Sequence, residues 1–172
     1  VGRGDGDLDS AAVATVLELF KQGDHLIIHD DLYGGTYRYL VSISKQHGVT
    51  FDFINLRDLD ALRAAIKPNT KGIWTETPTN PLMNLLDLAA IAAVAREHGC
   101  ITICDNTFSS PYFQKPLSLG IDIVMHSMTK YINGHSDVVA GALILSDADL
   151  AEELQFYQKA MGTCLGPFDS YL

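Results

Sequence analysis

The sequence has little positive charge and no long apolar run. Its 172 residues contain 12 Lys and Arg against 21 Asp and Glu, which leaves a formal net charge of -9. A chain this acidic offers no basic surface for nucleic acid or for an anionic membrane. Its apolar runs are far shorter than the roughly 20 residues that a membrane-spanning helix needs. We therefore expect a soluble protein with neither nucleic acid nor a membrane as its partner.

Cysteine pairs and nucleotide-binding glycine motifs are also missing. The three cysteines are odd in number and contain no C-x-x-C pair, so we interpret them as reduced thiols of a cytoplasmic protein. The first residues do not have the order of a signal peptide, which agrees with that location. Neither G-x-G-x-x-G nor G-x-x-x-x-G-K-[ST] occurs, which disfavours a nucleotide-binding domain.

The sequence does contain a regular alternation of apolar strands and helices. Strands are predicted at 26–29, 49–54, 72–75, 100–104, 121–126 and 138–145, and helices at 10–22, 34–46, 59–66, 86–98 and 147–160. This alternation predicts an α/β fold with a mostly parallel sheet sandwiched by helices. Because ligands of such folds bind beyond the carboxyl ends of the strands, we sought chemistry in the loops that follow them.

Two of these loops combine turn residues with polar side chains. Residues 30–38 contain two glycines, which permit close backbone approach to a ligand, and Tyr33, which offers a ring face or a phenol. In residues 76–81 two prolines fix the path of the chain, and Asn80 offers an amide. Each loop taken alone is equally well interpreted as a structural turn.

Two further loops carry charge at the ends of apolar strands. Asp105 directly follows such a strand, and burying an unpaired carboxylate is costly, so we expect a cationic partner such as the protonated ring nitrogen of a cofactor. Ser127 and Thr129 place two hydroxyls beside Lys130, a group suited to phosphate oxygens. Lys130 is either an ordinary solvated charge or a nucleophile that forms a Schiff base.

His25 and His29 have the i, i+4 spacing of a helical metal pair. On a strand, however, four residues span roughly 13 Å, which is too far for one ion. We therefore expect no metal site.

Taken together, the loops resemble the pyridoxal-phosphate enzymes of cysteine and methionine metabolism, the family of the cystathionine γ-lyases and γ-synthases. The resemblance runs from about Ala11 to Leu172. It rests on residues 23–25, 30–36, 76–81, 105–108, 127–131 and 133–138, in family order and spacing. It implies the large, cofactor-binding domain of a fold type I transferase that uses pyridoxal 5'-phosphate.

The resemblance implies catalytic roles for two residues and a direct contact for a third. Lys130 would bind the cofactor covalently and later move protons between substrate carbons. Asp105 would pair with the ring nitrogen and keep it protonated. Tyr33 would stack on the ring and assist proton transfer.

The remaining cofactor contacts are implied in the same way. Ser127 and Thr129 would hold the phosphate, and Thr107 would lie against the ring. Asn80 would approach the ring hydroxyl or the substrate carboxylate. The resemblance also implies that Glu76 belongs to the site, but it assigns this residue no definite role.

The activity that the resemblance implies is carbon–sulfur chemistry on a small amino-acid substrate in transsulfuration. Residues 37–39 and 111–116 favour cystathionine γ-lyase, which converts cystathionine to cysteine, 2-oxobutanoate and ammonia. Cystathionine γ-synthase, which performs γ-replacement on an O-acylhomoserine, stays open, as does a non-catalytic fragment that binds the cofactor. The family forms homotetramers, and we expect the same of the intact protein.

The chain departs from the family in its length and in its first residues. Family members are much longer, so we expect residues 11–172 to be the cofactor-binding domain, truncated before a C-terminal substrate domain. Residues 1–10 are an atypical N-terminal segment, because Asp9 stands where the family has glycine. A carboxylate there would repel the phosphate of the cofactor.

Overall fold

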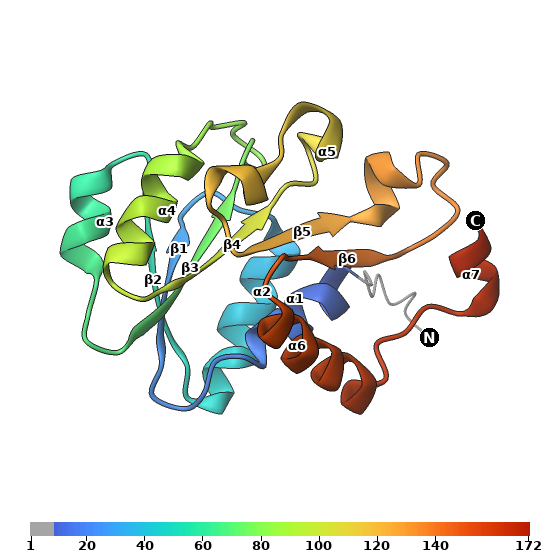
Figure 1. The fold of residues 1–172 in the computed structure, drawn as a ribbon, viewed down its shortest axis with the longest axis horizontal. Coiled ribbons are helices and arrows are strands. Elements are labelled where there is room, and N and C mark those ends of the chain that lie inside the picture. Colours follow the sequence, from blue (N-terminus) through green and yellow to red (C-terminus); the bar gives the residue numbers. More distant parts are fainter. Residues whose placement is uncertain (1–8) are drawn as a thin grey trace.

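A six-stranded sheet organises residues 9–172, the part of the chain that this computed structural model describes (Figure 1). The strands are β1 His25–His29, β2 Thr50–Ile54, β3 Thr70–Glu76, β4 Ile101–Asp105, β5 Ile123–Ser127 and β6 Gly141–Ile144. Their order is β2-β1-β3-β4-β5-β6, with β1 to β5 parallel and β6 antiparallel to β5. The predicted α/β fold with a mostly parallel sheet is thereby confirmed.

Helices cover both faces of this sheet (Figure 1). The helices are α1 Asp9–Leu17, α2 Gly34–Ser42, α3 Leu59–Ala65, α4 Leu88–Glu97, α5 Ser110–Phe113, α6 Ala148–Met161 and α7 Pro167–Tyr171. Three shorter helical segments are η1 Ser44–His47, η2 Pro116–Leu119 and η3 Met128–Ile132. Helices α1, α2 and α6 pack on one face, and α3 and α4 pack on the other.

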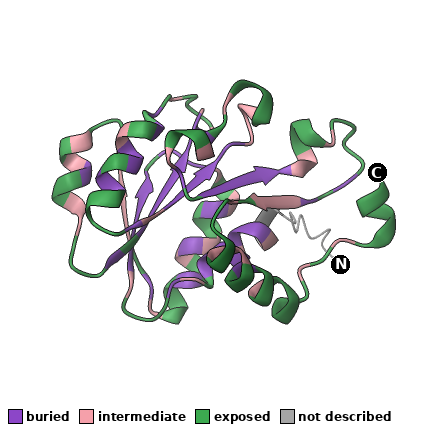
Figure 2. Cartoon of the chain, in the orientation of Figure 1, coloured by how far each residue is buried: buried purple, intermediate pink, exposed green. Residues whose placement is uncertain are grey.

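The central strands are buried on both faces, as Figure 2 shows in purple. In β1, Leu26 and Ile28 belong to the core under α1 and α2, whereas Ile27 belongs to the core under α3 and α4. Burial on both faces explains why these strands are nearly continuous apolar runs. Polar residues therefore gather where the strands end.

The strand predicted at 138–145 is shorter and runs in the opposite direction to its neighbour. In the structure β6 covers Gly141–Ile144, and Val124 of β5 lies opposite Ile144. The connection from β5 contains only η3 and a loop, so no crossover helix carries the chain back to the start of the sheet. A chain that returns directly can pair only antiparallel.

Two predicted helices are shorter than the apolar pattern indicated. The helix predicted at 10–22 ends at Leu17, and the chain continues in tighter turns, with the Leu19 N–H donating to the Val16 carbonyl at 3.2 Å. The helix predicted at 34–46 is interrupted at Ile43. Gly48, with φ of 80°, ends η1 in the left-handed conformation that glycine adopts readily.

The atypical segment predicted at 1–10 lies largely outside the described residues, which begin at Asp9. In the described part of the chain, no helix is long and apolar enough to cross a membrane. Cys100 and Cys104 are buried free thiols, and Cys164 is an exposed one.

Candidate active site

The carboxyl ends of β1, β3, β4 and β5 meet at one edge of the sheet, because these strands are parallel. A small cavity lies at this edge. It is lined by Val13, Tyr33, Thr36, Glu76, Pro78, Asn80, Asp105, Thr107, Phe108, Met125, Ser127 and Lys130. The structure thus brings together six of the seven residues predicted to contact a cofactor, and Glu76, whose role the sequence left open, lines the same cavity.

Thr129 is the predicted residue that does not line this cavity. Its hydroxyl accepts the Ala140 N–H at 3.0 Å and lies 3.3 Å from the Ala140 carbonyl oxygen. These contacts tie η3 to the segment that enters β6.

Lys130 reaches the cavity from η3, directly beyond the carboxyl end of β5. This segment is a single turn of π-helix, and Lys130 has non-helical angles there, with φ of −94° and ψ of −113°. Irregular turns of this kind recur at functional sites. Here the irregular turn places an exposed amine beside two buried strand ends.

Asp105 is held by a chain of hydrogen bonds that crosses from β4 to β5. Its Oδ1 accepts the Thr107 N–H at 3.0 Å and the Thr107 hydroxyl at 2.6 Å. The same hydroxyl oxygen accepts the Ser127 N–H at 2.8 Å. Thr107 therefore orients the carboxylate, a contact that the sequence did not reveal.

Glu76 lies beside Asp105, because these residues are paired across β3 and β4. Burial and the neighbouring Asp105 carboxylate raise the pKa of Glu76 to about 8. Its Oε2 accepts the Tyr33 N–H at 2.8 Å, and the carboxyl also accepts the Asn80 N–H. The signal in the sequence was the same as for Asp105: each carboxyl ends an apolar strand.

The tyrosine ring occupies the space over a glycine. A Cβ added to Gly35 would lie 2.2 Å from Cε1 of Tyr33. In this structure the group that approaches the Gly35 backbone is the Tyr33 ring.

The cavity combines an amine, paired carboxyls, hydroxyls and an aromatic ring. This set fits a pyridine ring that carries an aldehyde and a phosphate: Lys130 suits the aldehyde, Asp105 the ring nitrogen, Tyr33 the ring face and Ser127 the phosphate. Among residues 9–172, no group of three or more His, Cys, Asp and Glu side chains is placed to hold a metal ion. Fold and site together define an α/β enzyme domain suited to pyridoxal phosphate.

Comparison with known proteins leads to the same class. The sequence profile described as "Cys/Met metabolism PLP-dependent enzyme" matches residues 9–172. The chain belongs to this family, whose cofactor is pyridoxal 5'-phosphate.

Its relatives include several enzymes of cystathionine metabolism. The chain is 57% identical over 161 residues to a probable cystathionine gamma-synthase of Herpetosiphon aurantiacus, covering 94% of this chain and 50% of the relative. It is 48% identical to the cystathionine gamma-lyase of Bacillus subtilis, covering 94% and 43% respectively. The chain thus spans half or less of the length of these relatives.

A solved structure shows the same fold. The crystal structure of cystathionine gamma-lyase from Lactobacillus plantarum complexed with L-serine superposes with a TM-score of 0.93 at 49% identity. The superposition covers 94% of this chain and 42% of that one. The predicted fold type I architecture is confirmed.

Proposed function

We propose that the chain is the cofactor-binding domain of a cystathionine γ-lyase, which performs γ-elimination on cystathionine. The observation that carries this proposal is the convergence of Tyr33, Asp105 and Lys130 on one cavity at the carboxyl edge of the sheet. We further propose that a C-terminal substrate domain follows residues 11–172 in the intact enzyme. Coverage of only 43% of the B. subtilis γ-lyase supports that division.

Each side chain has a task that follows from its position. When bound, pyridoxal phosphate supplies a ring that stabilises negative charge on the α-carbon of the substrate. The Asp105 carboxylate keeps a proton on the ring nitrogen, held in place by Thr107. Lys130 would take the α-proton at Nζ, while Tyr33 would cover the ring and assist the transfer.

The remaining residues bind and orient. Ser127, at the carboxyl end of β5, binds the phosphate, and Thr129 braces the same turn through Ala140. Asn80 orients the ring hydroxyl or the substrate carboxylate from the rigid loop after β3. Thr107 also lies against the ring.

Cystathionine γ-synthase is the second candidate, favoured by the 57% identity to the Herpetosiphon relative. Release of 2-oxobutanoate from cystathionine by the intact protein would support the lyase. Formation of cystathionine from cysteine and an O-acylhomoserine, without that release, would support the synthase. Neither turnover, with the cofactor bound, would contradict both candidates and leave a cystathionine β-lyase or a non-catalytic binding protein.

We propose that the intact protein is a cytoplasmic homotetramer. Exposed apolar side chains support an assembled form: Tyr112 and Phe113 are each 83% exposed on α5. Sedimentation of the intact protein tests this, and a clean monomer would contradict it.

The direct test of the site is reduction of the intact protein with borohydride after addition of pyridoxal phosphate, followed by peptide mapping. We expect a phosphopyridoxyl group on Lys130. Lys115, on the neighbouring loop, serves as the matched control and should remain unlabelled. Scattered or absent labelling in the wild-type protein would contradict the proposed function.

A further inference from the structure

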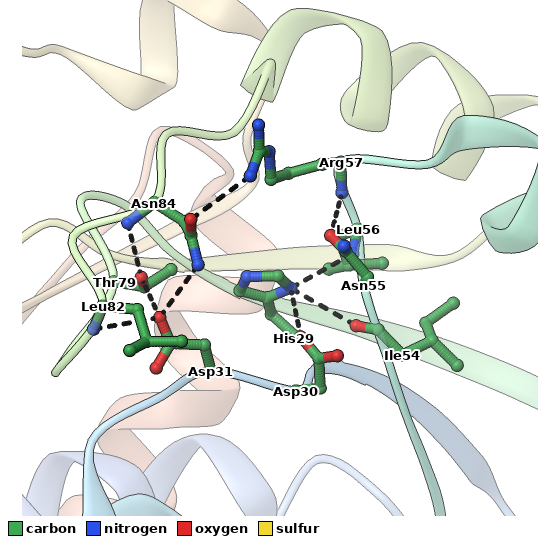
Figure 3. Close-up of polar contacts among 10 residues, drawn as sticks. All are labelled: His29, Asp30, Asp31, Ile54, Asn55, Leu56, Arg57, Thr79, Leu82 and Asn84. Carbon is green, nitrogen blue, oxygen red and sulfur yellow. Dashed lines mark hydrogen bonds and ion pairs between the residues drawn. The ribbon is translucent and has the colours of Figure 1, made fainter.

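Asp30 and Asp31 are neighbours in the sequence, but the structure gives them different surroundings. Both follow β1 directly. The Asp30 side chain is 51% exposed and faces the His29 ring at 3.4 Å. Asp31 is buried and points toward the loop that follows β3 (Figure 3).

One oxygen of Asp31 accepts three hydrogen bonds from that loop (Figure 3). The donors are the Thr79 hydroxyl, the Leu82 N–H at 3.2 Å and the Asn84 side-chain amide at 3.2 Å. Hydrogen bonds to a carboxylate are stronger than those between neutral groups. A single carboxylate thus binds residues 79 to 84 at three points.

The loop is also closed on itself and tied to a third strand end. The Thr79 hydroxyl oxygen accepts the Asn84 N–H at 2.8 Å, and the Met83 N–H donates to the Thr79 carbonyl at 3.0 Å. Arg57, from the loop after β2, donates to the Asn84 side-chain oxygen at 3.3 Å. The loops after β1, β2 and β3 are therefore joined around Asp31.

The two residues that this arrangement can position both line the cavity. Asn80 follows Thr79 directly, and Tyr33 lies two residues after Asp31. Glu76 joins the same two residues directly, since its carboxyl accepts hydrogen bonds from the backbone N–H groups of Tyr33 and Asn80. Asp31 itself is not among the lining residues, so it acts on the site through others.

We propose that Asp31 is a positioning residue that sets the loop carrying Asn80 against the loop carrying Tyr33, and thereby shapes the site for the cofactor ring. This inference rests on the proposed function. Asp30 has no such role, although the sequence does not distinguish the two residues.

The test compares Asp31→Ala with Asp30→Ala in the intact protein. The measurements are the dissociation constant of pyridoxal phosphate from the apoprotein and the visible circular dichroism of the bound cofactor at saturation. We expect Asp31→Ala to weaken binding by about tenfold and to reduce the dichroism per bound cofactor. Asp30→Ala should leave both unchanged. A loss of stability alone would not alter the dichroism of the fully loaded protein.

Asp31→Asn and Asn84→Ala complete the series. The asparagine retains an acceptor oxygen, so it should recover most of the binding, and Asn84→Ala removes one donor and should weaken binding by about threefold. If Asp31→Ala does not fold, Asn84→Ala decides the question. Wild-type binding and dichroism in Asn84→Ala would then overturn the role of Asp31.

The outcomes separate this inference from the proposed function. Labelled Lys130 in the wild type, together with unchanged binding and dichroism in folded Asp31→Ala, overturns the role of Asp31 alone. An equal change in Asp30→Ala does the same. A wild-type protein that takes no label at Lys130 overturns the proposed function and this role with it.

Discussion

The acidic side chains at the two ends of the sheet have different neighbours. Near the amino ends, Asp52 binds Lys67 at 2.6 Å and lies 3.2 Å from the His25 ring. At the carboxyl ends, the carboxyl groups of Glu76 and Asp105 lie side by side. The hydrogen bond from Lys67 lowers the pKa of Asp52, whereas burial and Asp105 raise that of Glu76 to about 8. The first arrangement stabilises the fold, whereas the second suits the protonated ring nitrogen that we propose Asp105 binds.

The largest expected effect comes from removing one carboxylate at the carboxyl end. Asp105→Asn in the intact protein should weaken pyridoxal phosphate binding by about 100-fold, because breaking a buried ion pair costs about 3 kcal/mol or more. The apoprotein should be more stable above pH 8, since Glu76 loses a like-charged neighbour. Titration with the cofactor and urea unfolding measure the two effects. Unchanged affinity would show that Asp105 does not pair with the ring.

Substitutions at two glycines separate an effect on cofactor binding from an effect on stability. Gly35→Ala should displace the Tyr33 ring and weaken cofactor binding by about tenfold, because the new Cβ would lie 2.2 Å from Cε1. Gly23→Ala, before β1, meets open space at φ of +94° and should lower the free energy of unfolding by about 1 kcal/mol without altering binding. Equal cofactor affinities in the two variants would contradict this distinction.

Glu76→Gln should flatten the pH dependence of apoprotein stability. Between pH 4.5 and about 8, native Glu76 keeps a proton that the unfolded chain releases. The free energy of unfolding therefore falls as pH rises through this range, by at most about 1.4 kcal/mol per pH unit from one group. Asp105 and Asp31 are the charged groups that sustain the shift. Urea unfolding across this range measures the slope, and an equal slope in the glutamine variant would exclude Glu76 as its source.

The smallest expected effect lies at the amino end. The pKa of Asp52 is lowered from 3.8, so its contribution is present above that pH and is lost as pH falls through the folded value. Its side chain is 37% exposed, which limits the loss in Asp52→Asn to about 1 kcal/mol or less at neutral pH. Added salt should reduce the difference, and cofactor affinity should not change. Thermal unfolding at two salt concentrations tests this.

The order of strands and helices was predictable because apolar periodicity reports burial directly. Strand β1 reads as a continuous apolar run because it is buried on both faces. The direction of β6 was not predictable from its own residues, since direction depends on whether a helix crosses back over the sheet. The early end of α1 at Leu17 was missed for a similar reason, because apolar residues continue into the tighter turns that follow.

The site was predictable to the extent that its residues directly follow strands. Asp105, Ser127 and Lys130 converge as expected, because parallel strands end at a common edge. The resemblance implied that Thr129 holds the phosphate, but Thr129 does not line the cavity, and its hydroxyl contacts Ala140, in the same connection between β5 and β6. How such a connection folds back on itself is not visible in local spacing.

The sequence by itself determined the layered fold, the edge at which the site forms and most of the residues that meet there. These features follow from strand periodicity, parallel direction and the polar residue after each strand. Only the tertiary structure decided that Asp31 is buried against Thr79 while Asp30 faces solvent, and that Glu76 lies beside Asp105. The reason is physical: burial, hydrogen-bond partners and like-charge proximity depend on which segments pack together, and adjacent residues of one type can meet opposite surroundings.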